Sequence, residues 1–181
     1  TEDEANAIAR LPEIRYAALW AQVMARLDYQ GERTQITAVF GGDAGFTTIQ
    51  GGQLSAGRWF THAEERSGAA VAVISELHAN RLFGRLDPLG KTMNIGGRPV
   101  QVIGIYQPPE NIFAPPGQET GAIVPYKFAE HGYRIDKTNM LFICAKPVDA
   151  VSVAAAQEAV TVLLRERRHL RPGDGNTFDL L

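Results

Sequence analysis

The side chains that most often serve catalysis or metal binding are few in this sequence, and they lie far apart. No histidine has a second metal-binding side chain at the spacing of a zinc site. The single cysteine, Cys144, lies inside an apolar stretch and can form no internal disulfide. We therefore predict neither a metal centre nor a disulfide framework. The four histidines are His62, His78, His131 and His169.

The carboxylates and the basic cluster give no clear reaction chemistry either. His62 and Glu64 have the His-x-Glu spacing of zinc deaminases, but the paired cysteines which that mechanism requires are absent. We interpret Glu13 and the adjacent Glu64 and Glu65 as solvated carboxylates rather than an acid/base pair. The basic run at residues 165–168 is interpreted as an exposed helix end whose charge complements the helix dipole.

Motifs for binding nucleotides or activating a serine are also missing. The sequence holds no phosphate-binding Gly-x-x-x-x-Gly-Lys-Ser/Thr loop, no Gly-x-Gly-x-x-Gly after a predicted strand, and no Gly-x-Ser-x-Gly elbow. We predict that the chain is not an enzyme, holds no cofactor and does not bind ATP. The two tryptophans, Trp20 and Trp59, are expected to be core or interface residues.

The composition narrows the function classes further. The chain has 181 residues, of which 45% are hydrophobic, with a net charge of -2. Such a chain creates no field that would attract nucleic acid or anionic lipid. The longest hydrophobic runs are six residues, far short of the roughly 20 that a membrane-spanning helix needs. The chain begins at Thr1 without a signal sequence, so we expect a fragment of a longer protein.

The N-terminal third predicts one helix and two strands. Thr1 and Glu4 fit a capping box, so a helix is expected from the first residue to near Leu11, where Pro12 ends it. Apolar residues then alternate from Ala17 to Leu27, which predicts a strand. A second strand is expected over residues 34–40.

The middle and the C-terminal third predict a mixture of strands and helices. We expect strands at residues 69–74, 92–95, 98–106, 122–125, 140–145 and 177–181. Helices are expected from Ser75 to Gly84, over residues 126–131, and after a cap at Asp149. The proline-rich stretch of residues 107–121 is predicted to be a loop that carries two large apolar side chains, Ile112 and Phe113.

These elements predict an α+β fold with two lobes. The opening α-β-β and the closing β-α-β segments are expected to form one discontinuous lobe from residues 1–40 and 138–181. Residues 41–137 are expected to form a small mixed α/β lobe inserted into it. Both chain ends then fall on one lobe, as in a domain inserted into a host chain.

Several motifs that follow one another with matching gaps resemble the periplasmic core domain of MacB-type ABC transporter permeases (MacB/FtsX-like family). The resemblance covers essentially the whole chain and is strongest in the middle lobe. Each motif is explained by turns and core residues rather than by catalysis. The motifs are the acidic opening of residues 1–12, Gly57-Arg58-Trp59-Phe60, residues 70–75, Leu82-Phe83-Gly84, Asp87-Pro88-Leu89-Gly90-Lys91 and Val102-Ile103-Gly104-Ile105.

The resemblance implies a porter-like lobe built from both chain ends and an inserted mixed lobe, lying between the first two membrane helices of a permease. It implies a periplasmic domain of an inner-membrane protein that transmits movement produced by ATP hydrolysis and so supports export. The implied partners are a second permease subunit, a cytoplasmic ATP-binding domain or subunit and, in some members, a periplasmic adaptor protein. The isolated chain is expected to be mainly monomeric.

Two other readings stay open from the sequence. One is a freestanding module that binds a ligand or protein between its lobes, and the other is a hydrolase that uses unrecognised carboxylates. Hydrophobic segments flanking the chain in the full-length protein would distinguish the permease reading from both. Ile112 and Phe113 are the candidate partner contacts, with packing onto their own lobe as the alternative.

Overall fold

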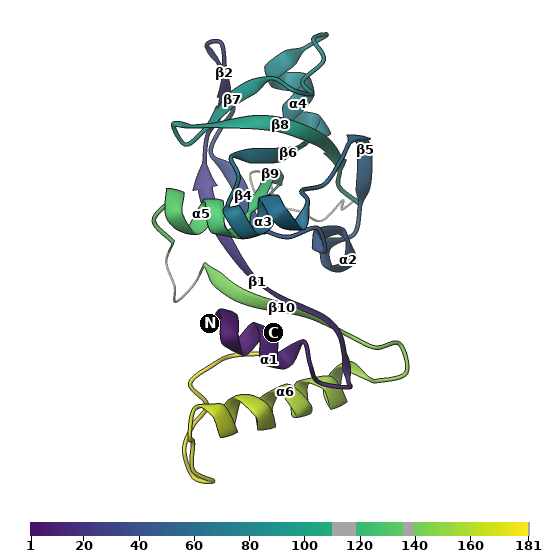
Figure 1. The fold of residues 1–181 in the computed structure, drawn as a ribbon, viewed down its shortest axis with the longest axis vertical. Helices are drawn as coiled ribbons and strands as arrows, with labels where there is room; N and C mark the ends of the chain where they lie inside the picture. The colour runs from purple at the N-terminus through teal and green to yellow at the C-terminus, as the bar shows by residue number, and fades with distance from the viewer. Residues whose placement is uncertain (110–118, 136–139, 181) are drawn as a thin grey trace. The chain divides into compact units, whose positions relative to one another are not determined.

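The computed structural model describes residues 1–109, 119–135 and 140–180, and it confirms the expected α+β class (Figure 1). The helices are α1 (Glu2–Ile8), α2 (Phe46–Gln50), α3 (His62–Ser67), α4 (Glu76–Phe83), α5 (Tyr126–Gly132) and α6 (Val153–Arg167). The strands are β1 (Ile14–Ala25), β2 (Leu27–Tyr29), β3 (Glu32–Arg33), β4 (Thr37–Gly42), β5 (Gln53–Gly57), β6 (Val71–Ser75), β7 (Thr92–Ile95), β8 (Arg98–Gln107), β9 (Thr120–Pro125) and β10 (Leu141–Pro147). No helix in these ranges is both long enough and apolar enough to cross a bilayer.

The strands form one mixed sheet. Its order is β10-β1-β4-β9-β6-β8-β7-β2-β3, and β5 pairs with β8 beside this path. Two pairs are parallel, β4 with β9 and β6 with β8, while β1 with β4 and β7 with β8 are antiparallel. Because the parallel partners are distant in the sequence, segments from the whole middle of the chain have to come together before the sheet is complete.

Local signals in the sequence explain most helix starts. Thr1 and Glu4 form the predicted capping box of α1, and Ser75 caps α4 as expected. The predicted cap at Asp149 is wrong, because Ser152 accepts the Ala155 amide at the start of α6 while Asp149 pairs with Arg15. A serine hydroxyl closer to the apolar run therefore caps the helix.

Two predictions in the chain map are corrected by the structure. Residues 177–180 form no strand, because the Thr177 carbonyl and hydroxyl accept hydrogen bonds from the Arg168 side chain instead of a neighbouring strand. The short helices α2 and α3 were not predicted. Helix α3 could have been predicted from the capping box that Thr61 and Glu64 form at its start.

The described chain divides into two compact units. Unit 1 comprises Thr1–Leu19 and Ile143–Leu181, and unit 2 comprises Trp20–Phe142. These boundaries differ from the predicted ones at residues 40 and 138. Ala21–Ala25 of β1 pair with Thr37–Gly41 of β4, and β4 pairs with β9, so residues 20–42 share their hydrogen bonds with the middle of the chain.

Unit 2 has an aliphatic core on one side of β1 and an aromatic cluster on the other. Val23 and Ala25 belong to the aliphatic core, which α4 and α5 cover with Leu82, Phe83 and Ala129. Figure 1 shows α5 lying across β4. The alternate residue Trp20 is fully buried and stacks on Phe46 of α2, with ring centroids 5.0 Å apart. Successive residues of one strand thus serve both layers.

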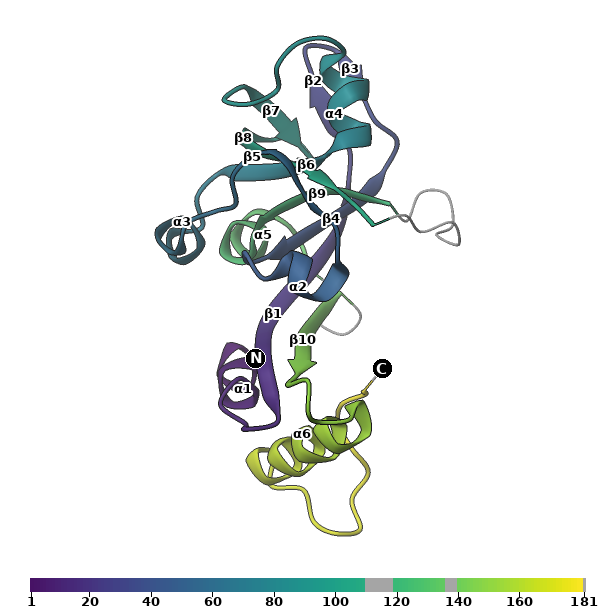
Figure 2. The same ribbon diagram turned by 90° about the vertical axis from the view of Figure 1, so that its right-hand side faces the viewer.

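Unit 1 has a smaller core of its own. Its buried residues come from α1, from the first residue of β1 and from one face of α6, and the two helices lie side by side (Figures 1 and 2). Leu11 and Phe178 are half-buried against this core. The buried residues of this core are Ile8, Ile14, Ala156, Val160 and Leu164.

Candidate functional site

In the part of the chain that the structure describes, the histidines and Cys144 do not gather into one metal-binding cluster. His62 and His131 are exposed on the surface, with 88% and 74% of their side chains accessible. His78 is buried, and Cys144 is half-buried in β10. Within the described ranges no three His, Cys, Asp or Glu side chains gather where they could hold a metal ion. The predicted contact residues Ile112 and Phe113 lie outside the described residues.

Two of the three carboxylates expected to be solvated, Glu64 and Glu65, accept hydrogen bonds from the protein. The Glu65 carboxylate accepts the Ala44 amide at 2.9 Å. Glu13 holds a buried Oε2 atom to which no hydrogen-bond donor is assigned. Glu64 accepts both terminal nitrogens of Arg58, at 2.8 and 2.9 Å. Glu64 and Glu65 are therefore held by hydrogen bonds rather than surrounded by water, and one oxygen of Glu13 is buried.

The hydrogen bonds of Arg58 explain the motif Gly57-Arg58-Trp59-Phe60 in structural terms. Arg58 also donates to the Trp59 carbonyl at 3.0 Å, and Glu64 closes the capping box of α3 through the Thr61 amide. The hydrogen bonds from Arg58 are the main cause that lowers the pKa of Glu64 to about 2. Arg58 therefore fixes the turn between β5 and α3, as a bidentate arginine–carboxylate pair can.

Ser75 and His78 form a buried polar pair at the junction of β6 and α4. Ser75 Oγ lies 2.6 Å from His78 Nδ1 and accepts the His78 amide at 3.4 Å. Burial lowers the pKa of His78, the charge of Glu119 opposes this shift, and the charge of Arg81 adds to it. Ser75 is only 2% exposed, so a substrate could not reach its hydroxyl. The pair is a helix cap rather than a nucleophile with its base.

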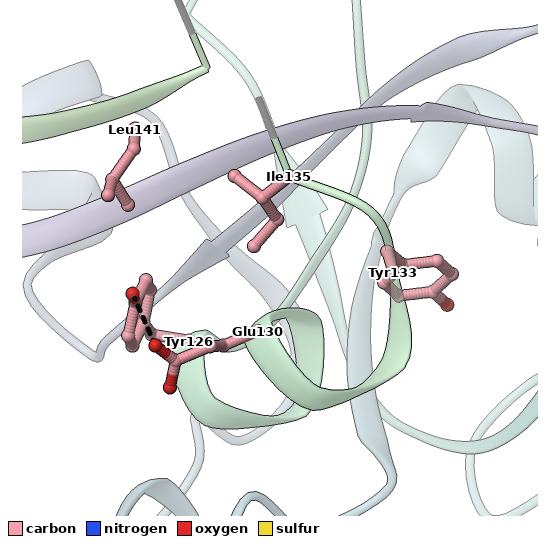
Figure 3. A pocket seen from close by; sticks show the side chains of 5 residues that line it. All are labelled: Tyr126, Glu130, Tyr133, Ile135 and Leu141. Carbon is pink, nitrogen blue, oxygen red and sulfur yellow. Dashed lines mark hydrogen bonds between the residues drawn. The ribbon is translucent and has the colours of Figure 1, made fainter. Parts of the chain in front are cut away.

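One surface hollow in unit 2 is small. It has a volume of about 140 Å³ and is lined by side chains from α5 and its C-terminal flank, together with Leu141 (Figure 3). Tyr126 donates to Glu130 at 3.2 Å along one wall. The hydroxyl of Tyr133 instead donates to the Ile95 carbonyl at 2.7 Å. This hollow is smaller than the sites that enclose drug-sized ligands.

A second hollow is an open groove of about 590 Å³ near the junction of β1 and β2. Met24 and Ile36 line it and are 48% and 51% exposed, which is high for large apolar side chains. Charged side chains of both signs line the same groove, from Arg26, Arg33 and Asp28. A mixed apolar and charged groove of this kind is typical of a contact surface rather than of an active site.

An ion pair in unit 1 joins Glu4 of α1 to Arg168 at the end of α6. Arg168 Nε donates to Glu4 Oε1 at 2.7 Å. The Arg168 side chain also donates to Thr177, so the basic run at residues 165–168 is not simply an exposed helix end. Sequence reasoning missed this pair because no local pattern links residues 164 positions apart.

The comparisons with known proteins agree on one family. The family model for the MacB-like periplasmic core domain matches residues 1–163. The pyoverdine export ATP-binding/permease protein PvdT of Pseudomonas entomophila is 30% identical over 170 residues, which cover 92% of this chain and 25% of that protein. The macrolide export ATP-binding/permease protein MacB of Chlorobaculum tepidum is 29% identical over 182 residues, covering 99% of this chain and 27% of that protein.

Solved structures show the same fold. The periplasmic region of MacB from Actinobacillus actinomycetemcomitans superposes with a TM-score of 0.75 at 21% identity, covering 92% of this chain and 73% of that one. The extracellular domain of the ABC-type transporter YknZ from Gram-positive bacteria gives 0.75 at 23% identity, covering 94% and 85%. The chain spans about a quarter of the length of the curated relatives it matches. It belongs to the family of MacB-like periplasmic core domains.

Proposed function

We propose that this chain is the extracytoplasmic domain of an ABC-type export permease and that it works without chemistry of its own. The observation that carries this proposal is the family match over residues 1–163. The relatives PvdT and MacB are named as export ATP-binding/permease proteins. Among the described residues, Ser75 and His78 cap helix α4, and Glu64 binds Arg58 at the turn before α3. These structural uses of potentially reactive side chains support a mechanical role.

The proposed mechanism is transmission of movement. ATP hydrolysis on a cytoplasmic domain or subunit would displace the membrane segments, and this domain would pass the displacement to partners outside the membrane. Coupling of this kind needs an element with two arrangements rather than a nucleophile. The first and last residues of the chain both belong to unit 1, which would then receive the displacement.

The proposed partners are a second permease subunit, a cytoplasmic ATP-binding domain or subunit, and an adaptor on the far side of the membrane. The location is the periplasmic face of the inner membrane. Ile112 and Phe113 remain the contact residues proposed from the sequence. Replacing both with serine should leave the melting temperature unchanged and impair export, whereas a large loss of thermal stability would show that they are core residues.

The proposal is tested in the full-length protein. The reading frame should contain hydrophobic segments of roughly 20 residues on both sides of the 181-residue chain. In reconstituted vesicles, deleting the domain should abolish export while ATP hydrolysis continues. A full-length protein without flanking hydrophobic segments would instead favour the freestanding binding module. A hydrolytic activity that co-purifies with the isolated chain and with several of its variants would favour the hydrolase.

A further inference from the structure

Arg168 joins three separate pieces of unit 1 through one side chain. It caps the C-terminal end of α6, and its Nε donates to Glu4 Oε1 of α1 at 2.7 Å. Its Nη1 donates to the Thr177 carbonyl at 2.6 Å and to the Thr177 hydroxyl at 3.0 Å. The guanidinium carbon lies 5.3 Å from the ring centroid of Phe178. We call this arrangement of Arg168, Glu4, Thr177 and Phe178 the terminal clamp.

The clamp is shielded from water more than an ordinary surface ion pair. The Glu4 side chain is 11% exposed and the Arg168 side chain 31% exposed. The hydrogen bond from Arg168 is the largest cause that lowers the pKa of Glu4 to about 2. The Thr1 hydroxyl donates to the other Glu4 oxygen at 3.0 Å. Both carboxylate oxygens are thus engaged, and the fork of the guanidinium is matched to fixed acceptors.

Arg168 links α1 directly to the C-terminal segment of unit 1 by hydrogen bonds. The core of unit 1 consists of five buried aliphatic residues, with Leu11 and Phe178 half-buried against them, and apolar contacts of this kind stabilise packing without fixing a direction. Residues 177–180 form no strand, so no ladder of backbone hydrogen bonds holds the C-terminal segment. The hydrogen bonds of Arg168 supply a directional link from α1 to Thr177.

We propose that Arg168 is a positioning residue that locks the first helix and the C-terminal segment of this domain into one body, so that displacement at either end of the chain moves both. The proposal rests on the proposed function for its transport consequence, but the locking itself does not depend on that function. The two segments are 173 positions apart between Glu4 and Thr177, so this one side chain closes nearly the whole chain into a loop.

Arg165 provides a matched control on the same helix. Its guanidinium donates to the carbonyls of Arg171 and Asp174 and to the Asn176 side chain, at 2.6 to 3.0 Å. All of these acceptors lie in the segment that directly follows α6. R165Q therefore removes one positive charge and several hydrogen bonds from the same helix end, while the link to α1 stays intact.

The locking is tested with spin labels on the 181-residue chain. Cysteines replace Asn6 of α1 and Asp179, both exposed, and C144S removes the native thiol. Pulsed electron–electron double resonance measures the distance between the two labels. It should give one narrow distance distribution for the labelled chain without further substitution and for R165Q. R168Q should lose that single distribution and show a broad one. Narrow distributions in R168Q would overturn the proposal.

Two conservative variants separate the clamp from folding. E4Q keeps the capping box, because glutamine serves at the third helical position, but it removes the charge that holds Arg168. It should broaden the distribution as R168Q does while circular dichroism stays unchanged. R168K keeps the charge but lacks the fork that reaches Glu4 and Thr177 together, so it should give an intermediate width. A narrow distribution in E4Q would also overturn the proposal.

The transport consequence is read in the full-length protein in vesicles. R168Q should keep ATP hydrolysis and lose export, and R165Q should keep both. If the parent itself exports nothing, the proposed function fails while the distance measurement still decides the locking. If R168Q broadens the distances yet exports normally, the clamp has no part in transport and that half of the proposal is wrong.

Discussion

The hydroxyl of Ser75 lies 2.6 Å from Nδ1 of His78, and both side chains are less than 10% exposed where β6 passes into α4. Burial lowers the pKa of His78 below its ordinary value of 6.5, and Glu119 opposes this shift while Arg81 adds to it. The folded protein therefore takes up a proton at this site less readily than the unfolded chain. This makes the free energy of unfolding depend on pH.

We expect the free energy of unfolding to fall as the pH drops below about 6.5, by at most about 1.4 kcal/mol per pH unit from this one group. H78Q should flatten the slope between pH 6.5 and 5, measured by urea denaturation at several pH values. H131Q, at an exposed histidine, should leave the slope as it is. An unchanged slope in H78Q would show that His78 is not the group responsible.

Replacing Gly57 should destabilise the domain more than replacing Gly97, because only Gly57 is closely surrounded by other atoms. Gly57 has φ of +74°, and a Cβ there would lie 2.2 Å from the Ile103 carbonyl oxygen. Gly97 has φ of +81° but no atom within 4 Å of its Cβ position. G57A should therefore cost more than about 2 kcal/mol, whereas G97A should cost only the backbone strain of about 1 kcal/mol. Equal urea midpoints for the two variants would contradict this reasoning.

Arg58 should control the ionisation of Glu64 more than it controls stability. The Arg58 side chain is 53% exposed, so R58A should lower the free energy of unfolding by less than about 1 kcal/mol. Carboxyl NMR titration should show the Glu64 pKa rising from about 2 toward its ordinary range. Arg66 is an exposed arginine in α3, the helix that holds Glu64, and R66A should leave the Glu64 pKa unchanged. The stability from the pair is present above about pH 4.5 and is lost as the pH falls toward 2.

The buried phenol of Tyr106 and the half-buried phenol of Tyr133 should lose their protons only at high pH. Burial raises the pKa of Tyr106 and of Tyr133 to about 12, and their hydroxyls donate to the carbonyls of Gly51 and Ile95. Y106F and Y133F should each remove one phenol from the high-pH step of an ultraviolet titration. Each should also cost about 1 kcal/mol, because a main-chain carbonyl loses the hydrogen bond from the phenol. Titration of either phenol near pH 10 would argue against its burial.

Elements with local signals could be predicted from the sequence. The caps at Thr1 and Ser75 are carried by residues three positions apart, and the hairpin turn at Gly96 and Gly97 is a pair of glycines with positive φ. The predicted strands at residues 92–95 and 98–106 are confirmed as β7 and β8. In each case the information lies within a few residues.

Features that depend on distant partners could not be read in this way. Thr177 lies in a stretch with the composition of a strand, but its hydrogen-bond partner is a side chain on α6 rather than a strand. Trp20 looks like one member of an alternating strand, and only the fold shows that it stacks on Phe46. The Glu4–Arg168 pair joins residues 164 positions apart. Tertiary contacts therefore decided these features against local preference.

The pairing of β1 with β10 has a consequence for the order of synthesis. The two strands are neighbours in the sheet, and Gln22 donates to the Met140 carbonyl at 2.9 Å, yet the ribosome makes them more than a hundred residues apart. Until β10 emerges, β1 has an unpaired edge, which is the kind of surface on which chains aggregate. Closing so long a loop also slows folding. A chaperone should therefore need to protect the nascent domain until β10 (Leu141–Pro147), near the C-terminal end, has left the ribosome.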